Sequence, residues 1–133
     1  MKRILGIDYG EKRIGLSLSD PLQMIASPFK TILNNSSLIA ALKNIIDEFE
    51  VEKVIVGMPI GLKGQETHQT KFVKDFITQL EENNIVVEYE DERLSSIAAK
   101  KSLIQQGIKT GHNKGLVDQT AAAIFLQLYL DRQ

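Results

Sequence analysis

The chain has 133 residues but no cysteine and no tryptophan, and it contains only three prolines. The lack of cysteine excludes disulfide bonds and thiolate metal sites, and it fits a reducing cytoplasm. Long apolar runs are missing too. The most apolar segment, 121–130, is interrupted by Gln127 and is far shorter than the ~20 residues of a membrane span. The stretch between Arg3 and Asp8 is too short for a signal-peptide core. We therefore expect a cytoplasmic protein without a membrane segment.

An excess of charge of either sign is also absent. Lysine and arginine number 16 and aspartate and glutamate 17, so the formal net charge is −1. A nucleic-acid partner is not indicated by this balance, and any basic surface must be local. Apolar residues make up 43% of the chain and charged residues 25%, which is typical of a globular protein. The length predicts one domain, 1–133.

Three short strands are predicted near the start of the chain. The apolar run 4–7 ends on Asp8, a polar turn at 9–13 contains Gly10, and a second run follows at 14–19. Two such runs joined by a glycine-containing turn predict a β-hairpin. A third run, 24–32, contains Pro28 and therefore suits an edge strand. Together they predict an antiparallel meander.

The rest of the chain alternates between helices and strands. Apolar residues keep helical spacing over 38–49 and 72–80, and a last helix is predicted over 116–130. Ser95 and Ser96 can cap a short helix that runs through Ile104, and apolar strands are predicted at 54–57 and 85–89. A buried strand between helices is typical of a parallel sheet. We therefore predict an α/β fold with a mixed five-stranded sheet, three antiparallel strands first and helices on both faces. Right-handed crossovers place the first strand beside 54–57.

Acidic residues stand where strands end. Asp8 and Glu92 each follow a strand, and the carboxyl ends of such strands meet at one edge of the sheet. Asp118 shares a helical face with Ala122 and Phe125, which directs it toward the sheet. Two simpler interpretations remain: Asp8 could cap a turn, and Asp118 could serve only to stabilise the helix dipole.

A cluster of Asp8, Asp118 and one or both of Asp91 and Glu92 would contain only carboxylates. Such hard oxygen ligands suit Mg²⁺ or Mn²⁺. Two of these ions, ~3.5–4 Å apart, can activate a water and stabilise the leaving oxygen of a phosphodiester. Strict strand alternation groups Asp91 with Val87 and favours Asp91 as the inward residue, although a bulge at the strand end can re-aim a side chain.

Cations accompany each proposed acid. Lys12 and Arg13 follow Asp8, and Arg93 and Lys114 stand near the later acids. This recurrence fits contacts to the phosphates of a polynucleotide, although solvated surface residues give the same pattern. Tyr9 is a candidate for stacking on an unpaired base, or for packing on the surface.

Four motifs in this order resemble the YqgF family: GIDYGEKRIGLSLSD, VIVGMPIGLKG, EDERLSS and NKGLVDQTAAAIFLQLYL. The family is described as Holliday-junction-resolvase-like and as nucleases for the precursor of small-subunit ribosomal RNA, and the resemblance covers essentially the whole chain. It implies a ribonuclease H-like fold, a cytoplasmic bacterial setting and a divalent-metal nuclease. It also implies Asp8, Glu92 and Asp118 as the acidic site, so that Glu92 replaces Asp91. Related nucleases usually have an acid where this chain has Gly57.

The leading hypothesis is metal-dependent hydrolysis of structured RNA, most specifically the 5′ end of pre-16S rRNA. In it Asp8, Glu92 and Asp118 hold Mg²⁺ or Mn²⁺, and the cations hold phosphates. A second hypothesis is resolution of branched DNA, which requires a dimer; the sequence indicates a monomer or a weak homodimer. A third is a non-catalytic nucleic-acid-binding module. Actin-like ATP-binding enzymes also begin with Asp-x-Gly, but they need two domains.

Overall fold

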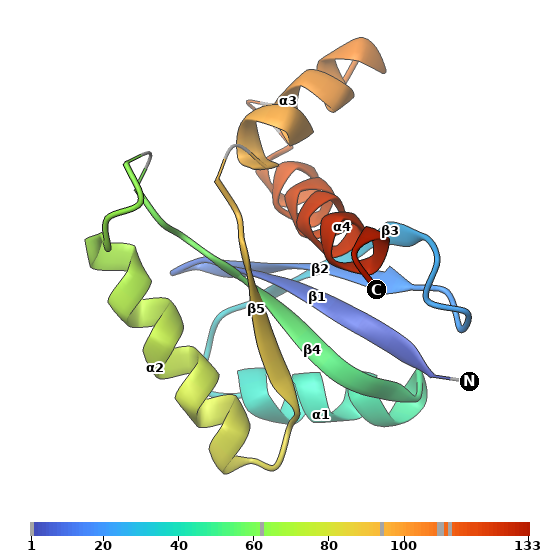
Figure 1. The fold of residues 1–133 in the computed structure, drawn as a ribbon, viewed down its shortest axis with the longest axis vertical. Helices are drawn as coiled ribbons and strands as arrows, with labels where there is room; N and C mark the ends of the chain where they lie inside the picture. Colours follow the sequence, from blue (N-terminus) through green and yellow to red (C-terminus); the bar gives the residue numbers. More distant parts are fainter. Residues whose placement is uncertain (1, 62, 94, 109–110, 112) are drawn as a thin grey trace.

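The computed structural model describes residues 2–61, 63–93, 95–108, 111 and 113–133, without the side chain of residue 96. It contains one five-stranded sheet of order β3-β2-β1-β4-β5, visible across the centre of Figure 1. The strands are β1 (Arg3–Tyr9), β2 (Arg13–Ser19), β3 (Ala26–Leu33), β4 (Val51–Met58) and β5 (Val87–Asp91). The first three are antiparallel, and β4 and β5 run parallel to β1.

Helices cover both faces of this sheet (Figure 1). On one face lie α1 (Leu38–Glu48) and α2 (His68–Glu82), on the other lies α4 (Lys114–Asp131), and α3 (Ser95–Gln105) packs on the outside of α4. Alternation along β1 separates the two cores, because Leu5 faces α1 and α2 whereas Ile4 faces α4. α4 is consequently buried on several sides, and Asp118 is its one charged residue between positions 115 and 130.

The predicted fold class is confirmed. The sheet is mixed, its three antiparallel strands come first, and β1 lies beside β4 as the crossover rule requires. β3 is the predicted edge strand, and the register shifts between Leu16 and Ser17 opposite Pro28, which has no N–H for the ladder.

Several boundaries differ from the prediction; β4, for example, spans Val51–Met58 rather than 54–57. β5 begins at Val87 rather than at 85, because the chain leaves α2 through Asn84 in a left-handed conformation (φ 62°) and joins the ladder only afterwards. α4 begins at Lys114 rather than at 116, so Asp118 lies in its second turn. Within the described ranges, no helix combines the length and apolar character that crossing a membrane requires.

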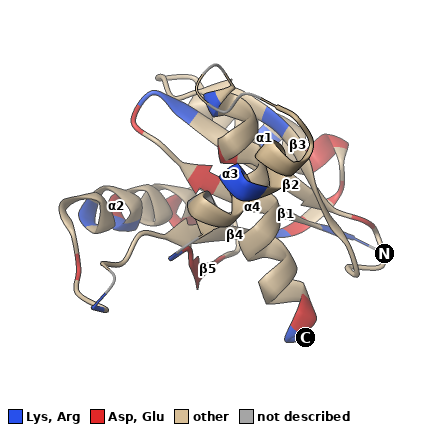
Figure 2. Ribbon diagram, turned by 90° about the horizontal axis from the view of Figure 1, so that it is seen from above, with Lys and Arg blue, Asp and Glu red and all other residues tan. Residues whose placement is uncertain are grey.

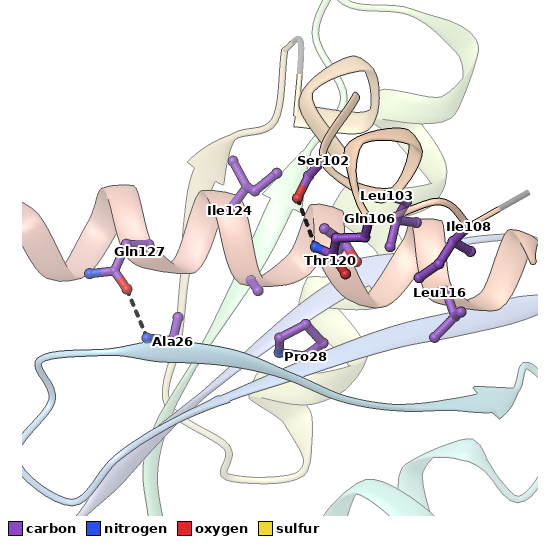
Figure 3. A pocket seen from close by; sticks show the side chains of 11 residues that line it. Ala26, Pro28, Ser102, Leu103, Gln106, Ile108, Leu116, Thr120, Ile124 and Gln127 are labelled. Carbon is purple, nitrogen blue, oxygen red and sulfur yellow. Dashed lines mark hydrogen bonds between the residues drawn. The ribbon is translucent and has the colours of Figure 1, made fainter. Parts of the chain in front are cut away.

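A groove of about 450 Å³ runs between α3, α4 and β3 (Figure 3). Its lining includes Leu103, Ile108 and Ile124, and the Gln127 side-chain carbonyl accepts a 2.8 Å hydrogen bond from the Ala26 N–H at one end. None of the predicted acids lines this groove. It marks where α3 and β3 meet α4, and the acidic residues gather elsewhere.

Candidate active site

Two of the predicted acids meet at the carboxyl edge of the sheet. Asp8 is near the end of β1, and Glu92 directly follows β5. Their carboxyl groups lie within hydrogen-bonding reach of each other, and this contact raises the pKa of Asp8. Both residues are half-buried, so they are partly withdrawn from water but still open to solvent.

Gly57 makes room for this pair. It is the last residue but one of β4, and a Cβ built on it would lie 2.6 Å from Oε2 of Glu92 and 2.7 Å from Cε2 of Phe125. Related nucleases are expected to carry an acid at the position of Gly57. In this chain the Glu92 carboxylate, which follows the neighbouring strand β5, occupies the space above Gly57.

The third acid, Asp118, can lie near Asp8 because β2 carries a glycine, Gly15, where α4 packs against it. Gly15 pairs with Asp8 in the β1–β2 ladder, and a Cβ on Gly15 would lie 2.5 Å from the Asp118 carbonyl oxygen. Only a residue without a side chain lets α4 approach this closely. Asp118 is thus set beside Asp8, and its Oδ2 accepts a 2.7 Å hydrogen bond from Nε of Arg13.

Electrostatics reflect this crowding of carboxylates. Burial raises the pKa of Asp8 well above its usual value, and the charges of Glu92 and Asp118 raise it further. Burial is also the main cause that raises the pKa of Glu92 and of Asp118, although the Arg13 guanidinium opposes the rise at Asp118. The site therefore holds more negative charge than its own cations compensate.

The carboxylate oxygens of Asp8, Glu92 and Asp118 are suitable ligands for a hard divalent cation, but the three groups do not form a complete coordination site. Among the described residues, no three acids stand close enough together to form a complete ion site. A cation between Asp8 and Glu92 would require both carboxyl groups to be deprotonated, although the pKa of each is raised. Asp118 is held by Arg13, and its carboxylate would have to exchange partners to become a third ligand.

The structure sets Glu92, not Asp91, beside Asp8. Alternation grouped Asp91 with Val87 correctly, but the site face of β5 is the opposite, polar one. On that face Glu88 accepts hydrogen bonds from Lys53 and from Tyr129 of α4. The Asp91 carboxylate instead accepts a hydrogen bond from Nε of Arg93, which lowers its pKa.

The predicted phosphate-binding residues separate into two groups. Arg13 bonds Asp118, and the charge of exposed Lys114 also lowers the pKa of Asp118, which keeps both near the acids. Lys12 is exposed at the hairpin, and Arg93 pairs with Asp91. In Figure 2, α4 shows little charge along its middle, and a red and a blue segment mark its C-terminal end.

Tyr9 lies on the opposite side of β1 from the acids. Its ring packs on Phe76 of α2, with 4.4 Å between ring centroids. Base stacking by Tyr9 stays a prediction. Sequence reasoning placed Gly57 at the edge of the sheet with the acids, but it missed that Gly15 and Gly57 shape the site by leaving space for other groups. The signal was available, since glycine inside an apolar strand often marks a close approach of another backbone or side chain.

Comparison with known proteins shows the family to which the chain belongs. A family model described as Holliday junction resolvase matches residues 2–132. The chain belongs to the RuvX family. This finding confirms the resemblance seen in the four motifs, for which YqgF is the other name of the family.

Relatives of the RuvX chain match over nearly their whole length. A protein of Sulfurihydrogenibium is 37% identical, over 99% of this chain and 92% of its own, and a protein of Flavobacterium psychrophilum is 39% identical, over 100% and 99%. Both carry the name "Putative pre-16S rRNA nuclease".

Two solved structures share the fold of the RuvX chain. T. thermophilus RuvC in complex with a Holliday junction substrate has a TM-score of 0.57 at 17% identity, covering 99% of this chain and 95% of that one. A fowlpox virus resolvase with Holliday junction DNA has a TM-score of 0.60 at 11% identity, covering 98% and 97%. The predicted ribonuclease H-like fold of the RuvC type is thereby confirmed.

Proposed function

We propose that this RuvX-family protein is a Mg²⁺- or Mn²⁺-dependent nuclease, acting as one domain over residues 1–133. Its substrate is pre-16S rRNA, cut at the 5′ end in the cytoplasm. The observation that carries the proposal is the approach of Asp8, Glu92 and Asp118 at one edge of the sheet, where burial and the neighbouring carboxylates raise the pKa of Asp8. The names of the relatives support the choice of RNA.

Each residue has a role in this proposal. Asp8 and Glu92 are the ligands of the cation, and Asp118 joins them when Arg13 turns to a substrate phosphate. The cation supplies Lewis-acid activation of water and neutralises charge on the phosphoryl oxygens. Lys12, Lys114 and Arg93 hold neighbouring phosphates and fix the strand across the edge of the sheet.

Branched DNA is the second candidate substrate. It is favoured by the description of the family and by the fold shared with RuvC. A resolvase cuts two strands symmetrically, so this activity requires a homodimer; for the RNA reaction a monomer or weak homodimer suffices. A nucleic-acid-binding module without catalysis is the third possibility.

The test compares both substrates with matched variants. Pre-16S rRNA and a four-way DNA junction are each incubated with wild type, Asp8→Asn, Glu92→Gln and Asp91→Asn, with Mg²⁺ or with EDTA. We expect Mg²⁺-dependent cleavage of the RNA that Asp8→Asn and Glu92→Gln reduce at least ~100-fold. Asp91→Asn is the control, because its carboxylate bonds Arg93 rather than contacting Asp8.

The outcomes separate the hypotheses. Cleavage of the junction alone, with dimers in solution, favours the resolvase. Binding of either substrate without cleavage in any metal favours the non-catalytic module. Equal loss in Asp91→Asn and Glu92→Gln contradicts the assignment of Glu92.

A further inference from the structure

A second hollow opens at the same edge of the sheet but on the other face, between β5 and α2. Its volume is about 430 Å³, and its lining is largely apolar with one aromatic ring: Met58, Ile60, Ile77 and Tyr89. Lys74 and Glu66, which also line it, form an ion pair. A hollow of this size, apolar with a few polar groups, suits a planar organic ligand.

Tyr89 is the feature that indicates the kind of ligand. The side chain is 62% exposed, and within the described part of the chain no ring stacks on it and no hydrogen bond holds it. The other two tyrosines are engaged: Tyr9 packs on Phe76, and Tyr129 is 5% exposed and bonds Lys53. Tyr89 therefore lines the hollow with an aromatic ring that is available for stacking. Every nucleobase has a π-face that stacks on such a ring.

The hollow is close to the acids. Met58 pairs with Asp91 in the β4–β5 ladder and follows Gly57, over which the Glu92 carboxylate lies. Tyr89 precedes Glu92 by three positions, about 10 Å along a strand. Because β5 is the edge strand, a polynucleotide held at the acids can cross the carboxyl end of β5 and reach Tyr89.

Two cations stand along this path. Arg93 is exposed and pairs with Asp91, and Lys74 pairs with Glu66. Exposed ion pairs of this kind contribute little to stability, so a phosphate can take either cation from its partner. Phosphate contacts of this type position a strand without reading its sequence.

We propose that the hollow binds one unpaired nucleobase of the RNA strand that the acids cleave, stacked on Tyr89, with Lys74 and Arg93 holding the adjacent phosphates. This proposal rests on the proposed nuclease function. Stacking of a base on Tyr89 would make the enzyme selective for an unpaired nucleotide near the cleaved bond. The competing interpretation is structural: aromatic residues are common in strands, and Tyr89 would then only cover α2.

The lack of tryptophan in the chain provides a direct probe. Tyr89→Trp introduces a single indole at the hollow, and Phe72→Trp introduces one on α2 at a position that is 43% exposed and does not line it. Both variants are titrated in EDTA with a single-stranded RNA oligomer and with an abasic oligomer of equal length. We expect quenching only in Tyr89→Trp with the base-containing RNA. Equal quenching by the abasic oligomer, or in both variants, overturns the proposal.

Affinity gives a second measurement that does not depend on the tryptophan variants folding. Tyr89→Ala is expected to weaken binding of the RNA oligomer roughly 10-fold, and Tyr89→Phe, which keeps the ring, to bind like wild type. Circular dichroism and urea unfolding verify that the variants are folded. Equal affinity of Tyr89→Ala and wild type overturns the proposal.

These titrations need neither cleavage nor metal, so the two proposals can fail separately. Cleavage of RNA without base-dependent quenching overturns the nucleobase site alone. Base-dependent quenching without cleavage by wild type supports the nucleobase site and overturns the nuclease.

Discussion

At the scale of single residues, Gly57 determines where Glu92 lies. A methyl group there would meet the Glu92 carboxylate and the Phe125 ring at 2.6 and 2.7 Å. The carboxylate is the flexible partner, so Gly57→Ala should push it away from Asp8. We expect cleavage to fall at least ~10-fold and stability to fall by about 1–3 kcal/mol, measured by RNA cleavage and urea unfolding. Gly111→Ala is the control, since among the described residues, its chain neighbours aside, no atom lies within 4 Å of its Cβ position, and it should leave both quantities unchanged.

The raised pKa of Asp8 predicts a pH dependence of stability in metal-free buffer. A carboxyl group with a raised pKa in the folded state stabilises the fold while it is protonated. This contribution is complete below the unfolded pKa of ~3.9 and is lost as the pH rises through the folded pKa. In the Asp8→Asn variant no group ionises at this position, so the variant does not lose this stability as the pH rises. At pH 7 the variant should therefore be more stable than wild type by on the order of 1 kcal/mol.

Urea unfolding across pH checks this expectation. Asp91→Asn is the matched control, and its effect on stability at pH 7 should have the opposite sign. Arg93 lowers the pKa of Asp91, so the ionised Asp91 carboxylate stabilises the fold at pH values above the ordinary pKa of an aspartate. Adding Mg²⁺ should reduce the advantage of Asp8→Asn, since the ion stabilises the wild type alone. A metal-free Asp8→Asn protein less stable than wild type at pH 7 contradicts the expectation.

Asp8, Glu92 and Asp118 could be located from the sequence because each follows an apolar strand or shares an apolar helix face. The choice between Asp91 and Glu92 could not be made from alternation. Period two separates the faces of a strand but does not tell which face holds the site. Here the site face of β5 is polar, and only the tertiary contacts of Glu88 with Lys53 and α4 reveal it.

At the scale of elements, the docking of α4 on β2 depends on Gly15. A side chain there meets the backbone of Asp118, which cannot rotate away. Gly15→Ala should therefore lower stability by about 2 kcal/mol and abolish cleavage. Asp118→Asn should abolish cleavage without a comparable loss of stability, and urea unfolding with a cleavage assay separates the two. Equal stability of Gly15→Ala and wild type would show that α4 can shift without cost.

The elements themselves were predictable, because their apolar spacing is regular, but two features were not. The start of β5 depends on the left-handed turn at Asn84. The burial of α4 on several sides depends on α3 packing over it, a tertiary contact that the spacing within 114–131 does not encode.

At the scale of the whole molecule, binding must rely on few cations because the net charge is −1. If the four proposed phosphate-binding cations, Lys12, Arg13, Arg93 and Lys114, each neutralise one phosphate, the logarithm of the affinity for single-stranded RNA should fall with the logarithm of salt with a slope of about −3. Lys114→Gln should reduce the magnitude of this slope by roughly 0.7. Lys43→Gln, on exposed α1 surface, is the charge-matched control and should leave the slope unchanged. Fluorescence anisotropy over a salt series measures it.

The ion pair between Arg13 and Asp118 joins residues 105 positions apart. Contacts of such separation form late, because the closure of a long loop precedes any gain from it. A refolding chain can therefore complete the β1–β4 crossover and the approach of Glu92 while α4 is still undocked, and such an intermediate lacks its third acid. Under the proposed function, cleavage activity of refolding protein should therefore return no earlier than the contact between Arg13 and Asp118.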